Sequence, residues 1–219
     1  MAEVTYERYE GPEAAGQLDA FLPAYEEVYA DPPYCEGPSD VAEFIAHYRR
    51  QLDTRPGFRL VLARDAGEVV GFTYGYRLPA DTGWWGNLLE PMPAEFARET
   101  GERTFAVIEL AVRKPWRRRG IAAGLHALLL GGLAVERVTL TMRPEPEAAP
   151  AQSAYAAWGY RKVGESHPWL EAPVYDAMVL DLRAGSTPRG GVTPTPQARV
   201  RPAPRRRTPP ERPRERHSP

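Results

Sequence analysis

A glycine follows three arginines at the point where the chain changes from a strand pattern to a helix pattern. The stretch reads Arg117-Arg118-Arg119-Gly120-Ile121-Ala122. The first turn of a helix leaves backbone N–H groups unpaired, and the helix dipole makes that end positive. Glycine lets a ligand come close to the backbone, and the arginines add positive charge. The spacing therefore predicts a pyrophosphate-binding turn, although the P-loop pattern of nucleotide-binding proteins is absent.

A single carboxylate interrupts the apolar strand pattern that precedes this turn. Glu109 is the one charged residue between Thr104 and Val112. A lone carboxylate is costly to bury, so it must face a cavity or find a partner. Two interpretations stay open, in which Glu109 is a general base or is paired with an arginine on a neighbouring strand.

Other chemistry is not favoured by the residue types and their spacing. The one cysteine, Cys35, adds no partner for a histidine. The histidines are isolated and lack the spacing of metal ligands; they are His47, His126, His167 and His217. We therefore expect no metal site. Neither Ser153 nor Ser166 stands in a nucleophile-elbow context, which argues against a serine hydrolase.

The elements that would position these residues alternate between helix and strand periods. Helices are predicted over residues 14–29, with Pro23 as a kink, and over about 40–52, 120–133 and 148–158. In the second of these helices, Asp40 and Glu43 could form a capping box. Strands are predicted over 58–64, 68–78, 104–112, 137–142, 160–164 and 174–182, the first two joined as a hairpin. The long connection over residues 79–103 suggests a functional loop. This order predicts a mixed sheet covered on both faces.

The charge of the chain divides into two parts. Of 28 Lys and Arg residues, ten lie in residues 183–219, together with only two of the 29 acidic residues. The tail therefore carries +8 and residues 1–182 carry −9. The tail is rich in proline and lacks aromatic residues, so we predict that it is disordered. Without aromatic residues to stack on bases, nucleic acid is not a favoured partner.

Composition and targeting signals point to a cytoplasmic protein. The most apolar stretch, residues 120–135, is shorter than the roughly 20 residues that a membrane span needs. Residues 1–16 show no secretory signal, and a single cysteine fits a reducing compartment. We thus expect no membrane partner, and the sequence leaves a homodimer open.

Two motifs together resemble the GNAT (Gcn5-related) N-acetyltransferases. Residues 117–122 fit the family pattern Q/R-x-x-G-x-G/A, and residues 151–160 resemble A-x-x-x-Y-x-x-x-G-F/Y with Tyr155 as the motif tyrosine. The order of elements agrees as well, so the resemblance covers most of residues 4–182. It implies an α/β (α+β) fold with a mixed, mostly antiparallel sheet of about six to seven strands and helices on both faces. One departure is Ala148, where many members carry an asparagine that contacts the cofactor.

The resemblance implies a mechanism of direct acetyl transfer from acetyl-CoA to an amine, without a metal. The pantetheine arm would pair with the backbone of the strand residues Leu110, Ala111 and Val112. The pyrophosphate would lie on the N–H groups of residues 117–122. Tyr155 matches the general acid that protonates the leaving thiolate, and Glu109 would deprotonate the incoming ammonium. A buried Tyr155 that only packs on Trp158 stays an alternative.

The resemblance also places the amine acceptor between the first two helices and two loops. Aromatic and acidic residues gather in these segments, from which we select Tyr29, Trp84 and Trp85 as substrate-binding residues. Such walls suit a cationic amine, although Tyr29 also falls on the apolar stripe of its helix. The leading hypothesis is an N-acetyltransferase for a small cationic amine. A protein lysine or N-terminal acetyltransferase and a non-catalytic acyl-CoA-binding module are the alternatives.

Overall fold

The computed structural model describes residues 3–170 and 172–182. The predicted disordered tail, residues 183–219, lies outside them. The strands are β1 (Thr5–Glu10), β2 (Arg59–Asp65), β3 (Glu68–Arg77), β4 (Thr104–Val112), β5 (Arg137–Met142), β6 (Arg161–Ser166) and β7 (Tyr175–Asp181). The α-helices are α1 (Pro12–Ala15), α2 (Leu18–Tyr29), α3 (Pro38–Thr54), α4 (Ala94–Ala97), α5 (Ile121–Leu130) and α6 (Ala149–Ala157). Short 3₁₀ turns are η1 (Trp84–Asn87), η2 (Lys114–Trp116) and η3 (Pro146–Ala148).

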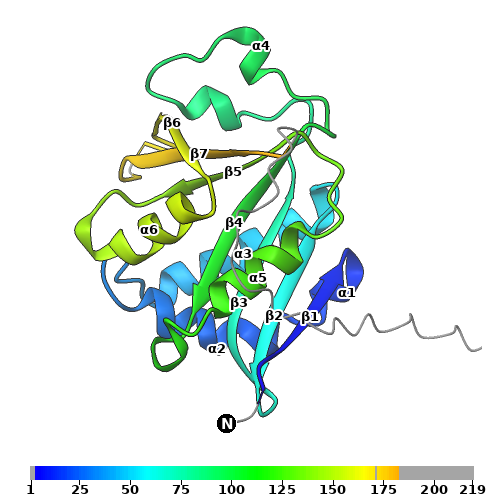
Figure 1. The fold of residues 1–219 in the computed structure, drawn as a ribbon, viewed down its shortest axis with the longest axis vertical. Helices are drawn as coiled ribbons and strands as arrows, with labels where there is room; N and C mark the ends of the chain where they lie inside the picture. Colours follow the sequence, from blue (N-terminus) through cyan, green and yellow to red (C-terminus); the bar gives the residue numbers. More distant parts are fainter. Residues whose placement is uncertain (1–2, 171, 183–219) are drawn as a thin grey trace, which may run out of the picture.

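The strands form one seven-stranded sheet in the order β1-β2-β3-β4-β5-β7-β6 (Figure 1). Every neighbouring pair is antiparallel except β4 and β5, which are parallel. A parallel pair needs a crossover connection, and α5 supplies it between β4 and β5. The predicted mixed, mostly antiparallel sheet is thus confirmed.

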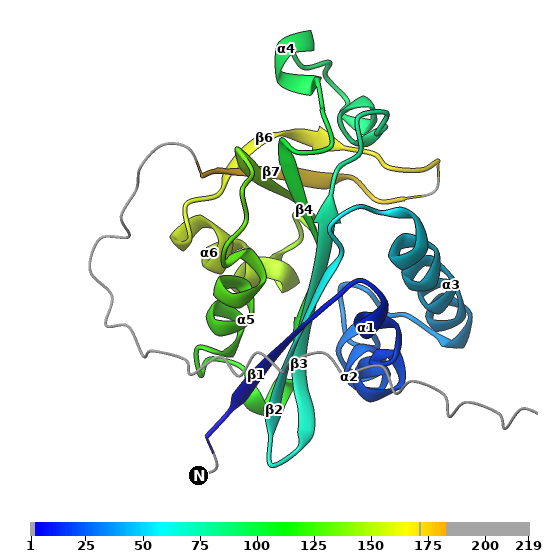
Figure 2. The ribbon, with the colours of Figure 1, turned by 90° about the vertical axis from the view of Figure 1, so that its right-hand side faces the viewer.

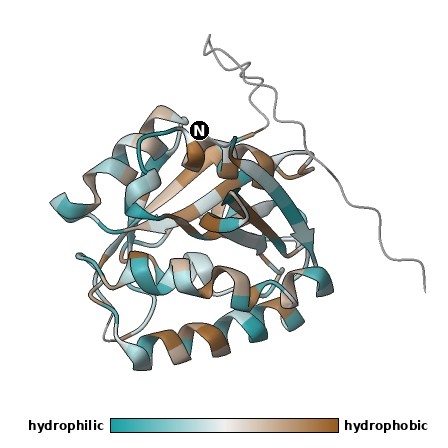
Figure 3. Cartoon of the chain, turned by 90° about the horizontal axis from the view of Figure 1, so that it is seen from below, coloured by the Kyte–Doolittle hydropathy of each residue, from teal (hydrophilic) through white to brown (hydrophobic). Residues whose placement is uncertain are grey.

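Helices cover both faces of the sheet, as predicted. Figure 2 shows α1, α2 and α3 on one face and α5 and α6 on the other. Each side has its own hydrophobic core, with Phe21, Tyr48 and Phe72 on the α2 side and Phe105, Leu125 and Leu129 on the α5 side. Seen from below, hydrophobic residues concentrate on the strands between the helical layers (Figure 3). Among the described residues, no helix has the length and hydropathy to span a membrane.

The structure differs from the predicted elements at three places near the start of the chain, namely β1, α1 with α2, and α3. Strand β1 was not predicted, because none of its six residues is fully buried and the sequence TYERYE lacks an apolar alternation. The predicted helix over residues 14–29 is two helices, which separate at Gly16 and Gln17. Helix α3 begins at Pro38 rather than Asp40, and the Asp40 carboxylate accepts a hydrogen bond from the backbone N–H of Gly37.

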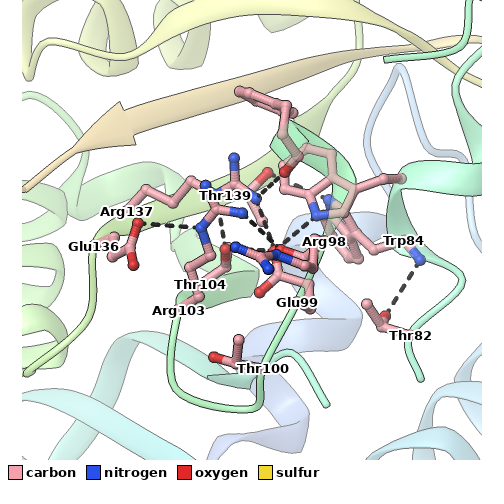
Figure 4. A network of polar contacts seen from close by, with 12 residues as sticks. Thr82, Trp84, Arg98, Glu99, Thr100, Arg103, Thr104, Glu136, Arg137 and Thr139 are labelled. Atoms are coloured by element: carbon pink, nitrogen blue, oxygen red, sulfur yellow. Dashed lines mark hydrogen bonds and ion pairs between the residues drawn. The ribbon is translucent and has the colours of Figure 1, made fainter. Parts of the chain in front are cut away.

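A buried ion pair fixes the long loop of residues 79–103 to the start of β4 and β5 (Figure 4). The guanidinium of Arg137 lies 2.8 Å from the Glu99 carboxylate, and it also donates to the hydroxyl of Thr104. The rings of Trp85 and Phe96 lie 4.6 Å and 4.2 Å from this guanidinium. Contacts from two strands and two loop aromatics therefore hold a loop that has little regular structure of its own.

Candidate active site

Strands β4 and β5 separate after a short parallel pairing. Residues Thr104–Ala106 of β4 pair with Arg137–Thr139 of β5. Strand β4 then continues for six more residues without pairing with β5. The backbone N–H of Arg113 donates to Val70 in β3. Because successive residues of a strand point their backbone groups to opposite sides, Leu110 and Val112 face the gap left by β5. Ala111 instead directs its backbone groups at β3, and its side chain is buried in the core.

The turn after β4 is tied to the end of that strand and contains two left-handed residues. The Arg117 side chain donates from Nε to the carbonyl oxygen of Val112, at 2.9 Å, and so ties the turn to the strand end. Two residues adopt left-handed backbone angles, Arg118 at φ 64° and Gly120 at φ 79°. A left-handed residue other than glycine is costly, so Arg118 stores local strain.

The start of α5 presents unpaired backbone donors. Within the described residues, the N–H groups of residues 118–122 donate to no backbone acceptor, and the first N–H after them that does is that of Gly124. The side chains of Arg117, Arg118 and Arg119 are exposed beside this end of the helix. Ile121 contributes only its backbone here, since its side chain is buried in the core. The arrangement can bind a diphosphate through N–H groups, the helix dipole and guanidinium groups.

Helix α5 lies very close to strand β1, and a glycine makes this approach feasible. A Cβ atom at Gly124 would stand 2.5 Å from the ring of Tyr6. Edge strand β1 therefore limits where α5 can lie, and the unpaired N–H groups stand at the start of α5.

A cavity of about 840 Å³ opens on the α2 side and reaches the gap between β4 and β5. Its walls combine aromatic rings with carboxylates, and the lining includes Tyr25, Tyr29, Tyr34, Glu36, Asp40, Glu43, Phe44, His47, Gln51, Tyr74, Tyr76, Trp84, Asn87, Glu109, Thr141, Arg143, Ser166, Trp169 and Tyr175. The one arginine of this wall, Arg143, is paired with Glu145 at 2.6 Å. The cavity wall is thus acidic as well as aromatic, which suits a cationic ligand.

A β-bulge turns Glu109 toward this cavity. Phe105 and Val107 face the α5 side, so strict alternation would send Glu109 there too. The register between β3 and β4 shifts by one residue at Ile108, however. After the shift, Glu109 lies on the α2 side of the sheet, where the hydroxyl of Tyr29 donates a hydrogen bond to its carboxylate.

The environment of Glu109 favours its protonated form. Burial raises the pKa of Glu109 to about 8, the negative charge of Glu36 adds to the rise, and the hydrogen bond from Tyr29 opposes it. The residue is half-buried, because the cavity reaches it. It forms no ion pair with an arginine among the described residues, so the structural interpretation with an arginine partner is not supported.

The sequence model of the acetyltransferase (GNAT) family matches residues 21–160. The chain belongs to this family. Solved structures agree with it in fold, among them a putative GNAT acetyltransferase from Desulfovibrio desulfuricans at 13% identity and TM-score 0.56, covering 82% of this chain and 99% of that one. The protein PH1933 from Pyrococcus horikoshii matches at 17% identity and TM-score 0.55, covering 82% and 98%. The NatC complex bound to Gag peptide and CoA matches at 13% and TM-score 0.53, covering 82% and 99%. A search of curated proteins found no match.

Tyr155 of this GNAT protein lies on α6, on the opposite side of the gap from the cavity wall. It is buried, and its ring makes edge contacts with Trp158 at 5.4 Å and Tyr160 at 5.3 Å between ring centroids. Burial raises the pKa of its phenol, and the charges of Tyr34 and Glu109 raise it further. Its hydroxyl makes no hydrogen bond within the described residues. The packing on Trp158 is therefore present, and the hydroxyl stays available for a ligand.

The three predicted acceptor residues have different surroundings in this GNAT protein. Tyr29 and Trp84 line the cavity. Trp85 does not: it is buried, its indole N–H donates to Glu99, and its ring covers Arg137. The structure thus places Trp85 away from the cavity, and a tryptophan pair in a loop does not by itself reveal which ring faces inward.

Sequence reasoning missed several residues of the cavity wall. Tyr74 and Tyr76 lie two positions apart on β3, so an aromatic alternation was the available signal. Arg143 follows the end of β5 and places its guanidinium over the rings of Tyr34 and Tyr175, at 5.9 Å and 5.6 Å. No group of three or more metal-ligating side chains occurs in the described part of the chain.

Proposed function

We propose that this protein transfers an acetyl group from acetyl-CoA to a primary amine of a small cationic molecule. The observation that carries the proposal is the position of Glu109, on a bulge beside the gap between β4 and β5 and at the wall of an acidic, aromatic cavity. One side of this gap offers backbone donors for an acyl donor. The other side offers a carboxylate and rings for an ammonium ion.

The residues present fit acetyl-CoA as the acyl donor. The unpaired N–H groups of residues 118–122 would hold the diphosphate, with help from Arg118 and Arg119. The backbone groups of Leu110 and the N–H of Val112 would pair with the amide-containing arm, whereas the Val112 carbonyl is held by Arg117. An N–H of this strand end would polarise the thioester carbonyl. Acetyl-CoA supplies the acetyl group as an activated thioester. Ala148 offers no amide side chain at the position where many GNAT members have asparagine, so the backbone site carries this interaction.

Two side chains would handle the protons of the reaction. Glu109 accepts a proton from the bound ammonium ion, which frees the nitrogen lone pair for attack on the thioester carbonyl. When the carbon–sulfur bond breaks, Tyr155 donates its phenolic proton to the thiolate. The nitrogen, which is positively charged after its attack, then gives its second proton to the phenolate, so that a neutral amide and the phenol of Tyr155 result. The high pKa of Tyr155 keeps the phenol protonated until that step.

Release of free thiol from acetyl-CoA tests the function directly. The panel contains monoamines, diamines and larger polycationic amines, together with peptides that carry a lysine or a free N-terminus. We expect thiol release with small cationic amines and little release with peptides. Release with peptides alone would establish the protein-acetyltransferase alternative, whereas tight acetyl-CoA binding without any release would indicate a binding module.

Replacement of Tyr155 by phenylalanine is expected to lower turnover without weakening acetyl-CoA binding. The variant loses the proton donor, for which general acid catalysis predicts a loss of at least about 100-fold in kcat. Steady-state kinetics and calorimetric titration with acetyl-CoA measure the two quantities separately. Tyr160→Phe is the matched control, since it removes a hydroxyl from the same aromatic cluster. Unchanged turnover in Tyr155→Phe would remove Tyr155 from this role.

We further propose that residues 4–182 contain all of the catalytic machinery. The sheet, the cavity and the turn before α5 are complete within them. A chain without residues 184–219 is expected to acetylate the same amine with kcat/KM within about twofold of the full chain, since no proposed catalytic group is lost. A collapse of activity in the shortened chain, with an unchanged circular dichroism spectrum, would show that the tail takes part in the reaction.

A further inference from the structure

The Glu109 carboxylate is held by a phenol rather than by a cation. The hydroxyl of Tyr29 donates to Oε2 of Glu109, and within the described residues Oε1 accepts no hydrogen bond. Both side chains line the cavity. One oxygen atom is therefore fixed, while the other stays free to accept a proton from a ligand.

Tyr29 is itself held in one orientation. Its ring stacks on Tyr25 at 4.4 Å between centroids and meets the ring of Tyr34 edge-on at 4.7 Å. The residue is only 6% exposed. Tyr25 in turn donates from its hydroxyl to Glu36 at 2.6 Å. Two stacked tyrosines on α2 thus hold two different carboxylates of the cavity.

We propose that Tyr29 is a positioning residue for the reaction, which orients the Glu109 carboxylate and sets the pH at which it accepts the proton of the amine. The proposal rests on the proposed function of the site. A rigid donor to one oxygen directs the free oxygen into the cavity and favours the ionised carboxylate.

The surroundings of Glu109 explain why this one hydrogen bond matters. Titratable groups whose charges interact with Glu109 lie on α2, in the segment before α3, and on β3, α6 and β7, namely Tyr25, Tyr29, Tyr34, Glu36, Tyr74, Tyr155 and Tyr175. None of them is a cation, and the one arginine of the cavity wall, Arg143, is paired with Glu145. Burial and the charge of Glu36 both raise the pKa of Glu109, and the Tyr29 hydrogen bond is what lowers it.

The first test is the pH dependence of kcat/KM in Tyr29→Phe. We expect the acidic limb of the profile to move up by about one pH unit, because a hydrogen bond to a charged group has about that effect on its pKa. At a pH on this limb the variant is then about tenfold slower, and it recovers toward the wild-type rate at higher pH. The same amine is used throughout, so that its own titration is common to all profiles.

Tyr25→Phe is the matched control, with the same ring, the same helix and the same loss of one hydroxyl. It removes the hydrogen bond to Glu36 and leaves the one to Glu109 intact. Whatever its effect on the height of the profile, we expect its acidic limb to move by less than half as much as that of Tyr29→Phe. Uniformly lower activity in Tyr29→Phe with an unmoved limb would overturn the proposal.

A readout without turnover separates this inference from the proposed function. In protein labelled with ¹³C at glutamate carboxyl groups, Glu109→Gln identifies the Glu109 resonance, whose titration is followed in the absence of any substrate. The titration midpoint is expected to rise in Tyr29→Phe and to fall when 3-fluorotyrosine, a stronger donor, is incorporated at position 29. The fluorinated protein keeps the ring and so serves where the phenylalanine variant does not fold. Unmoved midpoints would refute the role of Tyr29, whether or not an amine is acetylated.

Discussion

Replacement of Glu109 by glutamine is expected to lower kcat/KM for the acceptor amine by at least about 100-fold, the usual contribution of a general base. Glutamine has nearly the same shape, and its side-chain oxygen can still accept the hydrogen bond from Tyr29. The change therefore removes proton uptake and little else. Initial rates of thiol release at saturating acetyl-CoA measure the effect, and acetyl-CoA affinity serves as the control for an intact donor site.

The pH profile distinguishes a catalytic Glu109 from a structural one. Since only the ionised carboxylate accepts a proton, activity should rise with pH as Glu109 titrates near its pKa of about 8. This limb should disappear in Glu109→Gln. A variant that keeps both the limb and the rate would show that another group is the base.

Stability gives an independent check with a defined sign. The pKa of Glu109 is higher in the folded protein than in the unfolded chain, so its stabilising effect is complete below the unfolded value of about 4.5 and is lost as pH rises through about 8. Glu109→Gln should therefore gain stability relative to the wild type between pH 5 and pH 9. Urea unfolding at the two pH values measures this difference.

Replacement of Arg137 by leucine is expected to lower the free energy of unfolding by about 3–5 kcal/mol, the cost of breaking a buried ion pair from one side. The side chains of Arg137 and Glu99 are 4% and 0% exposed, and one oxygen of Glu99 already lacks a hydrogen-bond partner. Without the guanidinium, Glu99 would remain as an uncompensated buried charge. The rings of Trp85 and Phe96 would also lose the cation that packs against both of them.

Urea unfolding of the variant tests this expectation. The control is Arg98→Leu, because the pair of Arg98 with Glu95 is largely exposed, and pairs of that kind contribute about 1 kcal/mol or less. The double variant Arg137→Leu/Glu99→Leu should recover much of the loss, since it leaves no unpaired charge. A loss below about 1 kcal/mol in Arg137→Leu would contradict a compensating role for this ion pair.

The elements whose signals are local could be predicted from the sequence. Strand β4, the turn at Gly120 and helix α5 follow from an apolar run, a proline break, a glycine and a helical period within one short stretch. The hairpin of β2 and β3 is equally local, with Ala66 and Gly67 in left-handed conformations at its tip. The family match then confirmed the fold that these signals implied.

Features that depend on distant contacts could not be predicted. Edge strand β1 pairs with β2 but buries no side chain completely, so its sequence carries no apolar pattern. Trp84 and Trp85 are chemically identical neighbours, and only Trp85 has the contacts with Glu99 and with the distant Arg137 that hold it away from the cavity. The partner of Glu109 lies 80 positions away in the chain, and a tyrosine on the apolar stripe of a helix looks like an ordinary core residue.

The bulge at Ile108 changes which face of the sheet the odd-numbered residues of β4 occupy. Sequence alone assigns side chains to the faces of a strand by parity, and the extra residue reverses the parity of everything that follows it. The odd-numbered residues Phe105 and Val107, before the bulge, therefore pack in the α5-side core, whereas Glu109, after it, lines the acidic cavity. Comparisons of related chains should thus align this strand from the bulge onward, because a one-residue gap at this place would align Glu109 with a core position.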